Sequence, residues 1–84
     1  IENDFQSVLL YPVPARDVLH IKNLKGQLKK MELYSIDGRK VLEKQITTYE
    51  EQLNLDVSSI ANGTYIINLS TENQVYSKKI LISQ

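Results

Sequence analysis

His20 is the residue in this chain best suited to acid–base chemistry or metal binding, and it is the single histidine of the sequence. It lies in the run Asp17–Lys22, on the more polar side, opposite Leu19 and Ile21. Because neither a cysteine nor a cluster of carboxylates accompanies it, His20 is more typical of a surface residue than of a metal ligand or a catalytic base. We therefore expect neither catalysis nor a metal site at His20.

The other residue types that could act chemically do not form a known catalytic motif. No G-x-S-x-G stretch marks a nucleophilic serine, and the three glycines stand too far apart to form a phosphate-binding loop. Of the ten carboxylates, Asp37, Asp56 and the Glu50-Glu51 pair could form an acid–base site only if the fold happened to bring them together. Glycosidase chemistry would need two of them to meet across a cleft, which a thin domain does not readily provide. The sequence therefore predicts no enzyme and no cofactor.

Length and composition favour one small domain held together by packing. The chain has 84 residues, of which 42% are hydrophobic, and this is enough for a thin core between two layers. Ten basic and ten acidic residues balance, so no net charge attracts nucleic acid or an anionic membrane. The absence of cysteine excludes disulfides. Because the first residue is Ile1 and not Met, we expect a segment of a longer protein.

The chain consists of short strand-like runs separated by turn residues. Apolar and polar residues alternate in most runs, which is the period of a strand with one buried face. Seven such runs, with turn signals about every 8–12 residues and no helical periodicity, predict an all-β fold: a seven-stranded antiparallel immunoglobulin-like β-sandwich. An OB-type barrel fits less well, because it needs fewer and longer strands. The expected core contains Leu19, Ile21, Met31, Leu33, Leu53, Leu55, Tyr65, Ile67 and Leu69.

Two glycines mark expected turns. Asp37-Gly38 separates two strand-like runs and predicts a hairpin with a type I′ turn, in which both residues have positive φ. Asn62-Gly63 precedes the longest hairpin, and Ser58–Ala61 is expected to form one helical turn before it. Gly38 and Gly63 are therefore expected to be structural residues and not ligand contacts.

The adjacent pair Lys78-Lys79 interrupts the alternation of the last run. Adjacent side chains in a strand point to opposite faces, so one lysine should face inward or leave the ladder at a bulge. Protection of an edge strand against aggregation and a role in recognition both fit this pattern.

Five tyrosines raise carbohydrate binding as an alternative, because aromatic rings can stack on sugars. Tyr34 and Tyr65 lie in strand-like runs and are expected to anchor the sandwich through hydrogen bonds to loop carbonyls. Tyr49, in a polar connection, is the one tyrosine expected to be freely exposed. A single exposed ring is not a sugar-binding platform.

Four stretches of the chain, in this order, resemble a known family. They are Leu10–Asp17 (LYPVPARD), Glu32–Val41 (ELYSIDGRKV), Leu55–Tyr65 (LDVSSIANGTY) and Ser77–Ile82 (SKKILI). Over about residues 7–83 the chain resembles the type A C-terminal sorting domain of type IX (Por) secretion substrates in Bacteroidetes. The structural positions of the motif are Tyr11, Pro12, Pro14, Gly38, Gly63 and Tyr65. Val13 stands where the family usually has asparagine, so a hydrogen bond made by that asparagine is lost here.

The resemblance implies a non-catalytic secretion signal, with a lead-in at residues 1–6 and the sorting domain at 7–84. Such domains end larger exported proteins, which pass through the periplasm and are taken across the outer membrane to the cell surface. A sortase-like peptidase then usually removes the domain, here in or before residues 1–6. The implied partners are the outer-membrane translocon, this peptidase and an N-terminally joined cargo, with no nucleic acid and no small-molecule substrate.

The alternative is a structural or carbohydrate-binding β-sandwich module of a bacterial surface protein. If the chain is a sorting signal, we expect the translocon to recognise its last strand. The candidate residues are Lys78, Lys79, Ile80, Leu81 and Ile82.

Overall fold

The fold is built from strands throughout the part of the chain that the structure describes. The computed structural model describes residues 8–23, 28–47 and 51–84, so the expected lead-in at 1–6 and Tyr49 lie outside the described residues. The strands are β1 (Val8–Tyr11), β2 (Val18–Asn23), β3 (Lys30–Ser35), β4 (Lys40–Gln45), β5 (Gln52–Asp56), β6 (Gly63–Ser70) and β7 (Val75–Ile82). Within these ranges no helix is long and apolar enough to cross a membrane.

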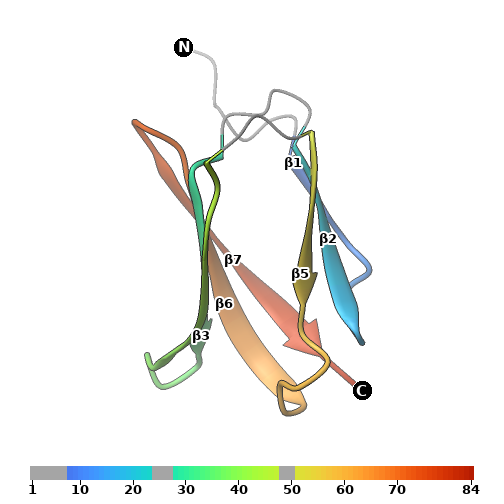
Figure 1. Cartoon of the computed structure of the whole chain (residues 1–84). Coiled ribbons are helices and arrows are strands. Elements are labelled where there is room, and N and C mark those ends of the chain that lie inside the picture. The colour runs from blue at the N-terminus through green and yellow to red at the C-terminus, as the bar shows by residue number, and fades with distance from the viewer. Residues whose placement is uncertain (1–7, 24–27, 48–50) are drawn as a thin grey trace.

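The seven strands form two antiparallel sheets that face each other (Figure 1). One sheet has the order β1-β2-β5 and the other has the order β4-β3-β6-β7. In constant-type immunoglobulin domains the fourth strand belongs to the sheet of the first, second and fifth strands. Here β4 pairs with β3 in the other sheet. The predicted seven-stranded antiparallel sandwich is therefore confirmed, with the fourth strand in the larger sheet.

The core lies between the sheets and follows the alternation of the strands. Along β6, for example, Tyr65, Ile67 and Leu69 are buried while the residues between them are only half-buried. All nine predicted core residues are buried, because the period of two gives each strand one apolar face. The described core also contains Ala15, Leu28, Ile46, Val57, Ile80 and Ile82.

The β3–β4 hairpin differs from the predicted type I′ turn. The Ser35 N–H donates to the Arg39 carbonyl at 2.8 Å, and the Gly38 N–H donates to the Ser35 carbonyl at 2.9 Å. Gly38 has a φ of 91°, but no described non-glycine residue has positive φ, so Asp37 lacks the conformation that type I′ requires. The loop has three residues, 36–38, and a glycine in the left-handed region at its third position is typical of that loop length.

Tyr65 ties β6 to the turn that precedes it. Its hydroxyl donates to the Ala61 carbonyl at 2.7 Å, four residues upstream. A tyrosine near the start of the sixth strand with this bond is the tyrosine corner of immunoglobulin-like sandwiches. Tyr34 behaves differently, and the prediction of a bond to a loop carbonyl is wrong for it. Tyr34 faces outward from β3, and its hydroxyl donates to the Glu32 carboxylate at 3.1 Å.

The connection from β5 to β6 is a turn and not the predicted helical turn. The Asp56 carboxylate accepts hydrogen bonds from the Ser58 N–H at 2.9 Å and from the Ser58 hydroxyl at 2.6 Å. The Ile60 N–H then donates to the Val57 carbonyl at 3.0 Å. An aspartate that bonds the backbone two residues on favours a local turn over a continuing helix.

Candidate recognition site

β7 lies at one edge of the four-stranded sheet and carries all five candidate recognition residues. It pairs with β6 at eight positions without a register shift. On its other edge, the Ala15 N–H donates to the Leu81 carbonyl and the Ser83 N–H donates to the Ala15 carbonyl, both at 2.8 Å. Among the described residues these are the only backbone bonds to that edge. Most of the free edge of β7 is therefore open.

The two lysines of β7 lie on opposite faces of the strand. Lys78 is paired with the buried Ile67 and is on the core-facing side, whereas Lys79 is paired with Ile66 on the outer face. Both lysines are exposed. Lys78 stays in water because β7 is an edge strand, so a long side chain can leave the sandwich sideways. The prediction of an inward-facing lysine is confirmed, and the bulge is excluded by the continuous ladder.

The three residues after Lys79 alternate between core and surface. Ile80 and Ile82 are 2% and 0% exposed, so a partner cannot contact them while the domain is folded. Leu81 is 43% exposed on the outer face. Of the five candidate residues, the structure therefore leaves the two lysines and Leu81 available for contact.

The proline motif brings Ala15 to the end of β7. Pro12 and Pro14 have no N–H to donate to a ladder, and β1 ends at Tyr11. Both X-Pro peptide bonds are cis. Ala15, which is fully buried, then forms a parallel bridge with Ile82. The proline motif therefore contacts the last strand through Ala15, a residue that the alternation of apolar and polar residues does not identify.

The turn before β6 holds the residues that follow β7. The Asn62 side-chain oxygen accepts a hydrogen bond from the Gln84 N–H at 2.7 Å. The Gln84 side-chain amide donates to the carbonyls of Val57 at 2.9 Å and Ile60 at 3.1 Å. Residues 81–84 are thus held by Ala15 on one side and by the 57–62 turn on the other. These contacts are called the β7 clamp below.

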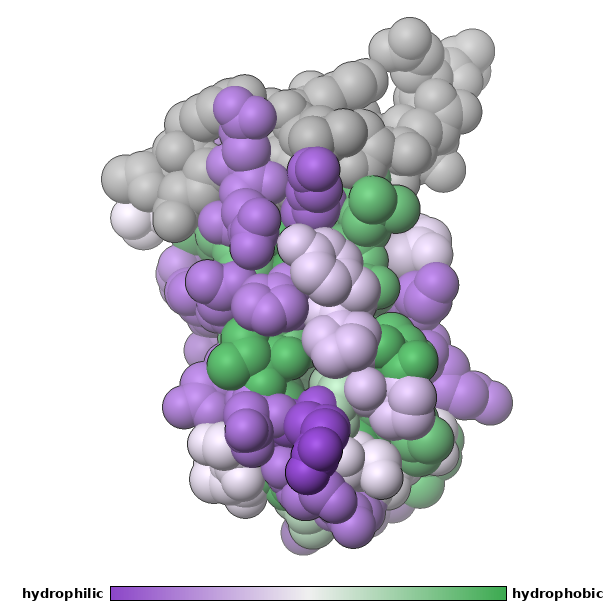
Figure 2. Space-filling view, turned by 90° about the vertical axis from the view of Figure 1, so that its right-hand side faces the viewer, coloured by the Kyte–Doolittle hydropathy of each residue, from purple (hydrophilic) through white to green (hydrophobic). Residues whose placement is uncertain are grey.

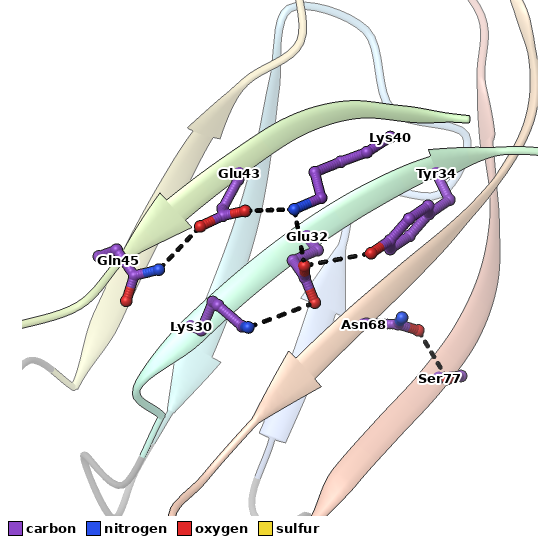
Figure 3. A network of polar contacts seen from close by, with 8 residues as sticks. All are labelled: Lys30, Glu32, Tyr34, Lys40, Glu43, Gln45, Asn68 and Ser77. Atoms are coloured by element: carbon purple, nitrogen blue, oxygen red, sulfur yellow. Dashed lines mark hydrogen bonds and ion pairs between the residues drawn. The ribbon is translucent and has the colours of Figure 1, made fainter. Parts of the chain in front are cut away.

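A polar network covers β3 and β4 on the outer face of the four-stranded sheet (Figure 3). The Glu32 side chain, only 12% exposed, is paired with Lys40 at 3.2 Å and Lys30 at 3.8 Å and accepts the Tyr34 hydroxyl. Lys40 also contacts the Glu43 carboxylate at 2.5 Å. These bonds raise the pKa of Lys40 and lower the pKa of Glu43. In the sequence, the only indication of this network is that Lys30 and Glu32, which have opposite charges, are both expected on the outward face of the same strand.

The outer face of the three-stranded sheet carries His20 next to an exposed tyrosine. His20 Nδ1 is hydrogen-bonded to the Asn54 side-chain oxygen at 2.7 Å, and the Tyr11 ring lies 5.2 Å from the imidazole, centroid to centroid. Tyr11 is 41% exposed, which corrects the expectation that Tyr49 alone is exposed. On the side shown in Figure 2, green apolar areas are separated by purple and white ones.

Similarity to known proteins assigns the family. A sequence model of the family described as "Secretion system C-terminal sorting domain" matches residues 9–83. The chain belongs to this family. Beta-agarase D of Zobellia galactanivorans is 30% identical over 80 residues, which are 94% of this chain and 16% of the agarase. The type IX sorting domain is a C-terminal secretion signal and is not an enzyme.

Three of the four motif stretches of the sorting domain meet at the β7 clamp. Leu10–Asp17 contributes Ala15, Leu55–Tyr65 contributes the turn that holds Gln84, and Ser77–Ile82 forms most of β7. The described residues contain no group of three His, Asp or Glu side chains that could hold a metal ion. Three of the four motif stretches therefore make the contacts that hold the last strand in place.

Acid should destabilise the sorting domain through aspartates that cap its turns. Side-chain hydrogen bonds from Ser58 and Ser35 lower the pKa of Asp56 and Asp37, respectively, below the ordinary 3.8. A carboxyl whose pKa is lower in the folded state stabilises that state above its unfolded pKa, and this contribution disappears as the pH falls through the folded pKa. Thermal melts followed by circular dichroism should therefore show a Tm that is steady near neutral pH and decreases below about pH 4.

The variant Asp56→Asn measures how much of this acid sensitivity comes from the Asp56 carboxylate. It should have a lower Tm than the wild type at neutral pH and a smaller decrease of Tm in acid, because one titrating cap is gone. An identical pH dependence in the two proteins would rule out Asp56 as a source of the effect.

Proposed function

We propose that this sorting domain takes an N-terminally joined cargo from the periplasm across the outer membrane through the type IX translocon, which docks on the β6–β7 hairpin. A sortase-like peptidase then cuts in or before residues 1–6, and the cargo stays on the cell surface or is released. The family match over residues 9–83 supports the secretion role. A polysaccharide-degrading cargo, such as the agarase relative, is one candidate.

The observation that carries the docking part is the β7 clamp. The end of β7 is assembled from stretches that are far apart in the sequence, namely Ala15, the 57–62 turn and residues 81–84. Its exposed side chains, Lys79 and Leu81, therefore take up their arrangement only in the folded domain. A partner that binds this surface distinguishes a finished sorting domain from an unfolded chain.

A fusion to a folded reporter protein tests the export role. The reporter carries a periplasmic signal peptide at its N-terminus and residues 1–84 at its C-terminus, and it is expressed in a type IX-competent Bacteroidetes host. We expect reporter at the cell surface or in the medium, measured by surface labelling and by blotting of cell fractions. Appearance of a shortened reporter would support cleavage near residues 1–6.

Two controls make this result specific. An immunoglobulin-like sandwich of similar size without a sorting function replaces residues 1–84 in the first control, and the host lacks its translocon in the second. Both should leave the reporter in the periplasm. Export in the translocon-deficient host, or periplasmic retention of the original fusion in the competent host, would refute the proposal.

A further inference from the structure

The outer face of the four-stranded sheet has two parts, which differ in whether their lysines form ion pairs with carboxylates. On β3 and β4, Lys30 and Lys40 are paired with Glu32 and Glu43, so two positive and two negative charges cancel within the network of Figure 3. On β6 and β7, Asn68 and Ser77 continue this polar part with a 2.6 Å hydrogen bond. The charged groups of this part are therefore paired with one another.

The second part of this face contains two aliphatic side chains, one lysine, and Thr64, which is paired with Leu81. Ile66 is paired with Lys79, and Leu81 is two residues further along β7 on the same face, diagonal to Ile66. Leu81 is 43% exposed and Ile66 is half-buried. Lys79 has no ion pair with any described residue, in contrast to Lys30 and Lys40 of the same face. These three residues, Ile66, Lys79 and Leu81, are called the β7 corner.

We propose that the β7 corner is the contact surface for the secretion machinery, and that its partner is an apolar protein surface carrying a carboxylate that pairs with Lys79. This inference rests on the proposed export function and names the chemistry of its docking surface. Apolar contacts of Ile66 and Leu81 supply affinity, and the charge pair sets orientation. The corner is completed by the β7 clamp, because Ala15 bonds the Leu81 carbonyl.

Lys78 is the matched control for Lys79. The two lysines are adjacent, exposed and equally charged, but Lys78 is on the core-facing side of the strand, paired with Ile67. A charged residue there protects an open strand edge from pairing with another chain. A partner bound to the outer face does not contact it. A comparison of the two positions therefore distinguishes an effect of positive charge anywhere on β7 from an effect of positive charge at the β7 corner.

Charge reversal at each lysine in the reporter fusion tests the proposal. Lys79→Glu should reduce surface reporter about tenfold or more, because it places two like charges together at the contact. Lys78→Glu should be exported within about twofold of the wild type, a change worth well under 1.4 kcal/mol. Leu81→Ser should also reduce export while leaving the isolated domain folded. Thermal melts of each purified domain show whether folding is retained.

Each outcome decides between explanations. Equal export of the two lysine variants, whether both normal or both lost, would overturn the β7 corner as the contact. If Lys79→Glu lowers the Tm, Lys79→Gln replaces it, and normal export of Lys79→Gln together with normal export of Leu81→Ser overturns the inference. Failure of the wild-type fusion to reach the surface would instead refute the export function on which the inference rests.

Discussion

Replacing Ile67 with alanine should lower the free energy of unfolding by about 2–5 kcal/mol, a large share of the about 5–15 kcal/mol typical of a small domain. Ile67 is 0% exposed in β6, between Leu33 of β3 and Lys78 of β7 in the sheet. Removing its buried methyl groups loses apolar burial and leaves a cavity between the two sheets. Urea unfolding followed by circular dichroism measures this change.

The neighbouring Ile66 provides the control for this prediction. It is the same residue type one position earlier in the same strand, but it faces outward and is half-buried. Ile66→Ala should therefore cost about 1 kcal/mol or less. A cost for Ile66→Ala equal to that for Ile67→Ala would contradict the assignment of Ile67 alone to the core, and a larger cost would mean that the two faces of β6 are reversed.

The faces of the strands were predictable because alternation is a local property. In β5 and β6, a period of two places Leu53, Leu55, Tyr65, Ile67 and Leu69 on one face wherever the strand pairs. The prediction needed no knowledge of partner strands. The antiparallel sandwich follows from the number of such strands and the short turns between them.

Features that depend on partner strands were not predictable in the same way. Alternation with Leu33 places Tyr34 on the outer face of β3, but it does not indicate that the hydroxyl bonds Glu32 and not the expected loop carbonyl. The turn at Asp37-Gly38 contains both residues that favour type I′, yet the loop is one residue longer, since Ser35 bonds to Arg39. Loop length and register, which are set by the pairing of β3 with β4, override the preference of the dipeptide.

At the candidate site, too, some features follow from the alternation within one strand and others require the pairing between strands. Alternation alone implied that Lys78 and Lys79 face opposite ways, but it could not say which one is on the outer face. That assignment requires the register with β6, where Lys78 meets the buried Ile67. Likewise, Ala15 is an unremarkable residue in the sequence until its bridge to Ile82 places it against the last strand.

Ending the chain after Lys79 should unfold the domain. The truncation removes Ile80 and Ile82, which are 2% and 0% exposed, and each buried isoleucine is worth about 2–5 kcal/mol. It also removes the β7 clamp and leaves Ala15 without its bridge. The combined loss is comparable to the whole stability of a small domain. Circular dichroism melts and limited proteolysis should show no cooperative transition and rapid digestion.

A chain ending after Ile82 is the matched control for this truncation. It keeps both buried isoleucines and the bond from Ala15 to the Leu81 carbonyl, but it loses the hydrogen bonds of Ser83 and Gln84. We expect it to fold cooperatively with a lower Tm, since each hydrogen bond contributes about 1 kcal/mol. A wild-type Tm for the chain ending after Lys79 would show that the end of β7 is dispensable for the core. If that chain unfolds as expected, its failure to be exported reports lost folding, and recognition is tested only by outer-face substitutions such as Lys79→Glu.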